Sequence, residues 1–187
     1  MNESDRDDVL RQFSGRQKSL EVALASLKAY VESECTQLSA EDRDFQWRLV
    51  EGRVKHPDSA MGTLKKAESG PDELWDVVDD VIGVRAVVVS KQMAEKLRDR
   101  LDRADASPIK NRNSKTMFNE ERGYRAIHVK GKLNTHDGEV GCEVQIRTEL
   151  EDYWGVVTHS DLYQSPVAKP SFARSTRRGG VIKYGVG

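Results

Sequence analysis

Hydrophobic residues recur along this chain of 187 residues with two different periods, which predict an alternation of helices and strands. A helix over about residues 15–35 is indicated by an apolar face made of Leu20, Leu24, Leu27 and Val31. The stretch from Val81 to Ser90 is β-branched and apolar on both faces, which is typical of a buried central strand. Together these patterns predict a domain in which helices cover a sheet.

Weaker patterns predict the remaining elements. We expect a strand over 47–55, a helix from Pro57, a short helix over 91–103, paired strands over 124–133 and 138–147, and a last helix over 149–163. Asp137-Gly138 is a hairpin signal, and Ser39 with Asp42 resembles a capping box that opens a further helical turn. Residues 107–121 have no apolar period and are predicted to form a long polar loop. The order of elements predicts an α+β fold with a mixed β-sheet flanked by helices.

Length and composition predict a single domain with appended ends. We expect an N-terminal helical segment over 1–45, a core over 46–165 and a basic, flexible tail over 166–187 that is rich in Ser, Gly and Arg. No apolar run approaches the roughly 18 residues of a membrane span, and the polar N-terminus is unlike a signal peptide. Two cysteines are too few for a disulfide scaffold. A cytoplasmic protein without membrane contact is therefore expected.

The charges nearly cancel but are sorted along the chain. The formal net charge is -1, from 30 Lys and Arg against 31 Asp and Glu, which argues against a wholly basic nucleic-acid binder. Residues 1–51 carry 11 acids and 7 bases, residues 109–132 carry 7 bases and 2 acids, and the chain after Pro166 carries 5 bases and no acid. The two basic segments are either solvated faces or surfaces for a polyanion such as nucleotide phosphates or RNA.

A phosphate-binding site is indicated by the segment RVKHPDS, since the chain contains neither GxxxxGKS/T nor GxGxxG. Arg53 and Lys55 lie on the same side of a predicted strand because they are two residues apart, and Ser59 lies at a helix start. An arginine, a lysine and a helix N-terminus that converge can cradle a polyphosphate. The alternative is an ordinary basic surface strand.

Acidic residues near the predicted centre of the sheet supply a candidate metal site. Asp80 enters the buried strand and Arg85 lies inside it, so both are costly there unless they are used or form an internal ion pair. Glu143, Gln145 and Arg147 share one face of the strand CEVQIRT, which is a solvent face unless Glu143 meets Asp80. Two carboxylates on adjacent strands can hold Mg²⁺, which binds one or two carboxylates together with substrate phosphates.

The segment RGYRAIHVK offers groups for a nucleotide base. Tyr124 and His128 share one face of the predicted strand, and Arg125 lies on the other. Gly123 permits a sharp turn before an aromatic ring that can stack on a base. The alternative is a half-buried tyrosine of the sheet.

Taken in order, RVKHPDS, DDVIGVR, RGYRAIH and EVQIRT followed by DYWGVVTHS resemble the synthetase domain of the RelA/SpoT family, and above all its small stand-alone alarmone synthetases. The resemblance covers roughly residues 53–163. It implies a nucleotidyltransferase-like α+β fold and the transfer of the pyrophosphate of ATP to the ribose 3′-hydroxyl of GDP or GTP, giving AMP and (p)ppGpp. It also implies a synthetase without the family's hydrolase domain, for which this chain has no room.

Carried over by position, the resemblance implies an ATP site and a catalytic centre. Arg53 and Arg85 would stack on the adenine, and the ATP phosphates would meet Lys55, Ser59 and Lys65. Asp80 and Glu143 would hold Mg²⁺, and Glu143 would also act as the base for the 3′-hydroxyl. Arg125 and His128 would contact the transferred group.

The resemblance likewise implies an acceptor site. Its residues would be Tyr124, His128, Lys115, Arg122, Asp152 and Arg147. Tyr124 would stack on the guanine, and Asp152 would select guanine over adenine by accepting from its N1–H and N2–H groups.

Two departures from the family's pattern bear on the substrates. The position four residues after Ser59, where the family usually has lysine, is Thr63, so Lys65 or Lys66 must take its place. The loop before Tyr124 reads FNEERGY where the family usually has Asn-Gly-Tyr. This loop normally binds the acceptor, so the acceptor could instead be the 3′ end of tRNA, which toxic relatives modify, or an adenine nucleotide. A separate alternative is a protein that binds nucleotides or RNA without catalysis. Relatives also suggest an antitoxin protein or further copies of the chain as partners.

Overall fold

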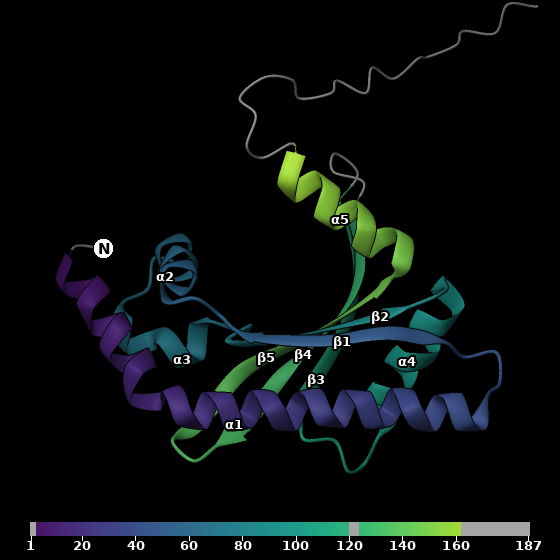
Figure 1. The fold of residues 1–187 in the computed structure, drawn as a ribbon. Helices are drawn as coiled ribbons and strands as arrows, with labels where there is room; N and C mark the ends of the chain where they lie inside the picture. The colour runs from purple at the N-terminus through teal and green to yellow at the C-terminus, as the bar shows by residue number, and fades with distance from the viewer. Residues whose placement is uncertain (1–2, 120–123, 162–187) are drawn as a thin grey trace, which may run out of the picture.

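Five strands form one mixed sheet in the computed structural model, which describes residues 3–119 and 124–161 (Figure 1). The strands are β1 (Trp47–Val54), β2 (Ile82–Val88), β3 (Lys110–Asn119), β4 (Tyr124–Thr135) and β5 (Gly138–Thr148). They are ordered β1-β2-β5-β4-β3. Neighbouring strands are antiparallel except β2 and β5, which are parallel and lie inside the sheet. The predicted α+β fold with a mixed sheet is thereby confirmed.

Helices cover the two faces of this sheet unequally. They are α1 (Glu3–Glu41), α2 (Pro57–Lys66), α3 (Leu74–Val77), which follows a 3₁₀ turn at Pro71–Glu73, α4 (Lys91–Arg103) and α5 (Glu149–Asp161). Figure 1 shows α1 and α4 beneath the sheet and α5 above it, with α2 at the opposite end from α5. In the described ranges, no helix combines the length and the hydrophobicity that a membrane span requires.

The hydrophobic core fills the space between α1, α4 and one face of the sheet. The sheet contributes alternate residues that are almost fully buried, namely Val84, Ala86, Val88, Cys142, Val144, Ile146, Ile127 and Val129. The helices contribute Leu20, Leu27, Val31, Leu97 and Leu101, which are also buried. Because side chains alternate along a strand, the residues between these point to the opposite face, and there the sheet is polar.

The first helix is longer than its predicted span of 15–35. Its buried face continues to Val9 and Phe13 in one direction and to Cys35 and Leu38 in the other. The predicted capping box at Ser39 is wrong, because Ser39 lies inside α1 and its hydroxyl donates to the Cys35 carbonyl at 3.0 Å. The N-terminal segment therefore packs on the sheet as part of the same core.

The predicted polar loop over 107–121 is also wrong, because Lys110–Asn119 forms strand β3 at the edge of the sheet. An edge strand needs hydrogen bonds to one neighbour only, here β4, and its side chains can stay exposed, as at Lys115 and Met117. Such a strand has no hydrophobic alternation to detect. Residues 120–121 of the predicted loop lie outside the described residues, as does the predicted tail over 166–187.

The predicted hairpin is confirmed. Thr135 pairs with Gly138 at the ends of β4 and β5, which leaves His136 and Asp137 as a two-residue turn. Gly138 has a φ of 113°, a conformation that glycine adopts without the strain that a side chain would bring.

The packing of α1 against the sheet predicts a measurable stability difference within one helix. Leu27→Ala removes a side chain with 0% exposure and should lower the free energy of unfolding by about 2–5 kcal/mol, because it leaves a cavity. The control is Val22→Ala on the same helix, where the side chain is 61% exposed and the loss should stay below about 0.5 kcal/mol. Urea unfolding at pH 7 compares the two, and equal losses would contradict this account of the core.

Candidate active site

The polar face of the sheet is organised by the parallel pairing of β2 with β5. In this register Gly83 lies opposite Glu143 and Arg85 lies opposite Gln145. On the other side of β5, the antiparallel strand β4 places Lys130 opposite Glu143 and His128 opposite Gln145. Three neighbouring strands thus bring acidic, basic and amide side chains together on the face that α1 and α4 do not cover.

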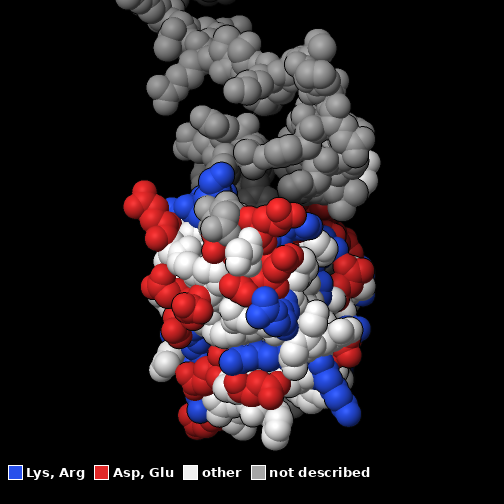
Figure 2. Space-filling view, turned by 90° about the vertical axis from the view of Figure 1, so that its left-hand side faces the viewer, with Lys and Arg blue, Asp and Glu red and all other residues white. Residues whose placement is uncertain are grey.

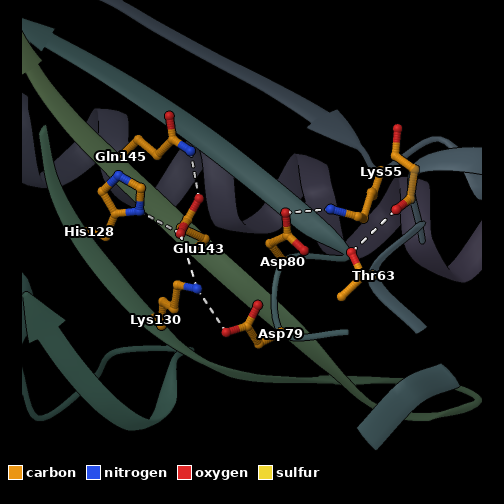
Figure 3. Close-up of polar contacts among 9 residues, drawn as sticks. Lys55, Thr63, Asp79, Asp80, His128, Lys130, Glu143 and Gln145 are labelled. Carbon is orange, nitrogen blue, oxygen red and sulfur yellow. Dashed lines mark hydrogen bonds and ion pairs between the residues drawn. The ribbon is translucent and has the colours of Figure 1, made fainter. Parts of the chain in front are cut away.

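Glu143 is a buried charged residue of this face, with 5% exposure (Figure 3). One carboxylate oxygen, Oε1, lies 2.6 Å from His128 Nδ1 and 3.5 Å from Lys130 Nζ. The other, Oε2, accepts a hydrogen bond of 2.6 Å from Gln145 Nε2. Burial by itself would raise the pKa of Glu143, but the hydrogen bonds from His128 and Gln145 and the charges of His128 and Lys130 outweigh it and lower the pKa to about 2. Glu143 is therefore a buried carboxylate that stays ionised.

Asp79 and Lys130 join this cluster although the sequence analysis did not select them. Lys130 Nζ lies 2.7 Å from Asp79 Oδ2. Burial would lower the pKa of Lys130, but the hydrogen bond to Asp79 and the charges of Glu143, Asp79 and Asp80 together raise it. The signals for both residues were present, since Lys130 is two residues from His128 on the same strand face and Asp79 adjoins Asp80.

A glycine allows the aspartates to approach β5. A Cβ atom at Gly141 would lie 2.5 Å from both the Cα of Asp79 and the carbonyl oxygen of Val78. Such distances are far below van der Waals contact, so any side chain at this position would push the backbone of residues 78–79 away. Gly141 therefore sets the distance between the two aspartates and the strand that carries Glu143.

Asp80 has its own cation in this structure. Lys55, which follows β1, donates to Asp80 Oδ2 at 2.7 Å, and both side chains are largely buried (Figure 3). Asp80 and Glu143 thus each have a positively charged partner, Lys55 for Asp80 and Lys130 for Glu143. The contact of Lys55 with Asp80 was not predicted from the sequence, and the predicted role of Lys55 toward phosphate stays a prediction.

The carboxylate oxygens of Asp80 and Glu143 have the chemistry that Mg²⁺ prefers. In residues 3–119 and 124–161 there is no group of three or more His, Cys, Asp and Glu side chains able to hold a metal ion. A divalent ion held by these two carboxylates would need further ligands, and Mg²⁺ commonly takes them from water and from substrate phosphates. The residues therefore suit an ion that arrives with a polyphosphate.

A second polar cluster links the sheet to α5. Arg85 contacts Glu51 on β1 and donates to Asp152 Oδ1 at 2.9 Å. The same oxygen lies 3.5 Å from Arg147 Nη1, and Arg147 Nη2 donates to Gln145 Oε1 at 2.8 Å. Because Gln145 also contacts Glu143, one continuous series of polar contacts runs from Glu51 to Glu143. Arg85 thus forms partly exposed ion pairs with Glu51 and Asp152, whereas Asp80 is paired with Lys55.

Of the candidate ATP residues, Arg53 lies on β1 and Ser59 and Lys65 on α2, whereas Arg85 contacts Asp152 of α5. Arg53 is exposed on β1 opposite Gly83, and Ser59 is exposed in the first turn of α2. The helix is capped by His56, whose side chain accepts from the Asp58 N–H at 3.3 Å. Thr63 occupies the next turn and its hydroxyl donates to the Ser59 carbonyl at 3.2 Å. Figure 2 shows that Lys and Arg side chains alternate with Asp and Glu over the α2 end of the molecule.

The candidate acceptor residues are only partly brought together. Lys115 on β3 lies opposite His128, and Asp152 and Arg147 contact each other as described. Arg125, which was expected near the transferred group, instead lies 3.8 Å from Glu151 of α5. Tyr124 begins β4 opposite Asn119, while its side chain and the whole of Arg122 lie outside the described residues.

Comparison with known proteins identifies the family. The family profile described as the region found in RelA / SpoT proteins matches residues 52–167. The chain belongs to the RelA/SpoT family. No curated protein matches the chain.

Solved structures show that this RelA/SpoT chain has the fold of small alarmone synthetases. It is similar to the small alarmone synthetase 1 from Bacillus subtilis bound to its product pppGpp, with 24% identity, a TM-score of 0.67 and 84% of each chain covered. A GTP pyrophosphokinase family protein from Streptococcus pneumoniae is similar at 22% identity and a TM-score of 0.66, over 80% of this chain and 75% of that one. The small alarmone synthetase 2 from Bacillus subtilis follows at 19% identity and a TM-score of 0.55, over 76% and 77%.

The environment of Glu143 predicts a specific dependence of stability on pH. Folding lowers the pKa of this carboxyl from 4.5 to about 2, so the folded state gains stability wherever the unfolded chain is already ionised. That gain, about 3 kcal/mol, is complete above pH 4.5 or so and disappears as the pH falls toward about 2. Urea unfolding between pH 7 and pH 2.5 should therefore show that Glu143→Gln loses less stability on acidification than the unmodified chain.

The matched control is Glu139→Gln, which changes an exposed glutamate on the same strand. Its acid dependence should follow that of the unmodified chain. Parallel pH curves for all three proteins would contradict the low pKa of Glu143.

Proposed function

We propose that this protein is a pyrophosphotransferase that moves the β,γ-pyrophosphate of ATP to the ribose 3′-hydroxyl of GDP or GTP, in the presence of Mg²⁺. The observation that carries the proposal is the buried, ionised Glu143 at the centre of a polar sheet face, in a chain of the RelA/SpoT family. Two structural relatives point to guanine nucleotides, since one holds pppGpp and another is named a GTP pyrophosphokinase family protein.

The proposed ATP site lies between β1, α2 and β2. Arg53 and Arg85 stack on the adenine, and Lys55 and Ser59 bind phosphate oxygens at the N-terminus of α2, where the helix dipole favours negative charge. Of the two lysines proposed to replace the one missing at Thr63, Lys66 lies within about 20° of Ser59 around the helix, whereas Lys65 is turned by about 120°. We therefore favour Lys66 over Lys65 as the residue that reaches the phosphates.

In the proposed reaction the acceptor's 3′-oxygen attacks the β-phosphorus of ATP. The bond between the β-phosphorus and the oxygen that bridges it to the α-phosphorus breaks, and AMP leaves with that oxygen. Glu143 accepts a hydrogen bond from the 3′-hydroxyl and aligns it, and the proton leaves toward the Glu143–His128 pair as the new bond forms. Because phosphoryl-type transfer depends mainly on alignment and charge neutralisation, a carboxylate of low pKa suffices for this task. Asp80 and Glu143 would hold Mg²⁺, which would supply charge neutralisation at the phosphates.

Substrate binding in this proposal exchanges partners that are already in place. Arg85 leaves Glu51 and Asp152 to stack on the adenine. The Asp152 carboxylate then keeps only one of its two arginine partners and can accept from the N1–H and N2–H groups of guanine. Arg147 keeps Asp152 oriented while Arg85 moves. Binding of the donor would thereby prepare the residue that recognises the acceptor's base.

The decisive experiment is an acceptor screen with the purified chain, Mg²⁺ and ATP. GDP and GTP should each give a product that elutes after GTP on anion exchange, with one AMP formed per product, whereas ADP and tRNA should give none. Glu143→Gln should lower the rate roughly 10²–10⁴-fold, as expected for loss of a group that handles the proton. Glu139→Gln, the exposed control on the same strand, should keep the rate.

Two outcomes would contradict the proposal. The first is the absence of any product from GDP and GTP while the chain is folded, and the second is label transferred from ATP to tRNA alone. Full activity of Glu143→Gln would leave the reaction intact but show that another group aligns the hydroxyl.

A further inference from the structure

The ammonium group of Lys130 lies between Asp79 and Glu143, a carboxylate of the proposed metal site. It is 2.7 Å from Asp79 Oδ2 and 3.5 Å from Glu143 Oε1, and the charge of Asp80 also acts on it. The other charged neighbours are His128, which contacts Glu143, and Lys55, which contacts Asp80 (Figure 3). Lys130 itself is 40% exposed, so its side chain has room to move outward.

A divalent ion would compete with groups that already hold the oxygens of Glu143. Oε2 is held by the neutral amide of Gln145, and Oε1 lies near both His128 and Lys130. A divalent ion and an ammonium group that share one carboxylate repel each other strongly in a partly buried site. Of the two groups beside Oε1, Lys130 has the longer and more flexible side chain. An ion that binds Glu143 therefore gains most if the ammonium group of Lys130 moves away.

We propose that Lys130 is a resident cation of this site, whose ammonium group occupies the position beside Asp79 and Glu143 that a divalent ion needs and must leave before the ion binds. The proposal rests on the proposed function only in naming Asp80 and Glu143 as the metal site. Lys130 holds the carboxylates together while no nucleotide is present. The phosphates of ATP offer the displaced ammonium group a new partner, so metal and nucleotide enter together.

The test measures binding of Mn²⁺ alone, as a paramagnetic stand-in for Mg²⁺, without nucleotide. Electron paramagnetic resonance of free Mn²⁺ gives the affinity at pH 7.5 and fixed ionic strength. Lys130→Met removes the charge and keeps the length of the side chain, and it should bind Mn²⁺ about tenfold more tightly, or better, than the unmodified chain. Lys130→Arg keeps the positive charge and should bind as weakly as the unmodified chain.

The matched control is Lys132→Met on the same strand face. Lys132 donates to the Trp75 carbonyl at 2.9 Å, so its removal lowers the positive charge of the strand without freeing a carboxylate. Its affinity for Mn²⁺ should change less than about twofold, because this charge is outside the cluster and its removal frees no carboxylate. Circular dichroism checks that each variant is folded, and Lys130→Gln replaces Lys130→Met if the latter is not.

Equal Mn²⁺ affinity of Lys130→Met and the unmodified chain would overturn the proposal, and so would an equal gain in Lys132→Met. Neither result depends on catalysis, because no nucleotide is present. A chain that transfers no pyrophosphate but shows the Lys130 effect would refute the proposed function and leave this inference standing. Pyrophosphate transfer by the unmodified chain, together with equal Mn²⁺ affinity of Lys130→Met and the unmodified chain, would support the proposed function and refute this inference.

Discussion

The parallel register of β2 and β5 is the constraint on which the rest of the structure depends. It places Val84 beside Val144 and Ala86 beside Ile146 on the face that α1 and α4 cover, so the core forms between them. The same register turns Arg85 and Glu143 to the opposite face. A shift by one residue would bury the charged side chains in the core and expose the valines, which would cost far more than the fold can lose. Core and candidate site are therefore two sides of one pairing.

Charge on the polar face is balanced pair by pair. Asp80 is matched by Lys55, Asp79 by Lys130, and Asp152 by two arginines. Ionised groups at a partly dry surface are costly unless they are paired, so the pairs let the site persist before any substrate binds. Substrates with phosphates and a metal ion carry charges of both signs. The substrate charges can therefore replace the side-chain partners in these ion pairs. No side-chain charge then has to lose its water shell without a partner when the substrate binds.

The sequence predicts the central elements of the fold well because their signals are local. Alternating and continuous apolar runs identify β2 and the β4–β5 hairpin, and the Asp137-Gly138 turn identifies the hairpin's end. The edge strand β3 escapes prediction because main-chain hydrogen bonds to β4 determine it and its side chains need no burial. The full length of α1 escapes prediction because residues 14–19 contain no apolar residue, which interrupts the pattern between Phe13 and Leu20.

The residues of the candidate site can be predicted from local motifs, but the contacts between them cannot. The motifs predict which strands carry Asp80, Glu143 and His128, and the structure brings these residues to one face. Which charges pair is decided by register between distant strands, so the contact of Lys130 with Asp79 cannot be read from either segment alone. The same holds for Arg85 with Asp152, which are joined only because α5 returns over the sheet.

Gly141 gives the candidate site an unusual dependence on a residue with no functional group. The backbone of Val78 and Asp79 rests where its Cβ would be, so the spacing of the aspartates relies on an empty volume. Alanine scanning normally reports what a side chain contributes by removing it. At this position the same substitution inserts an atom, and a loss of activity would measure displacement of its neighbours. A scan read in the usual way would thus credit Gly141 with chemistry that belongs to Asp79, Asp80 and Glu143.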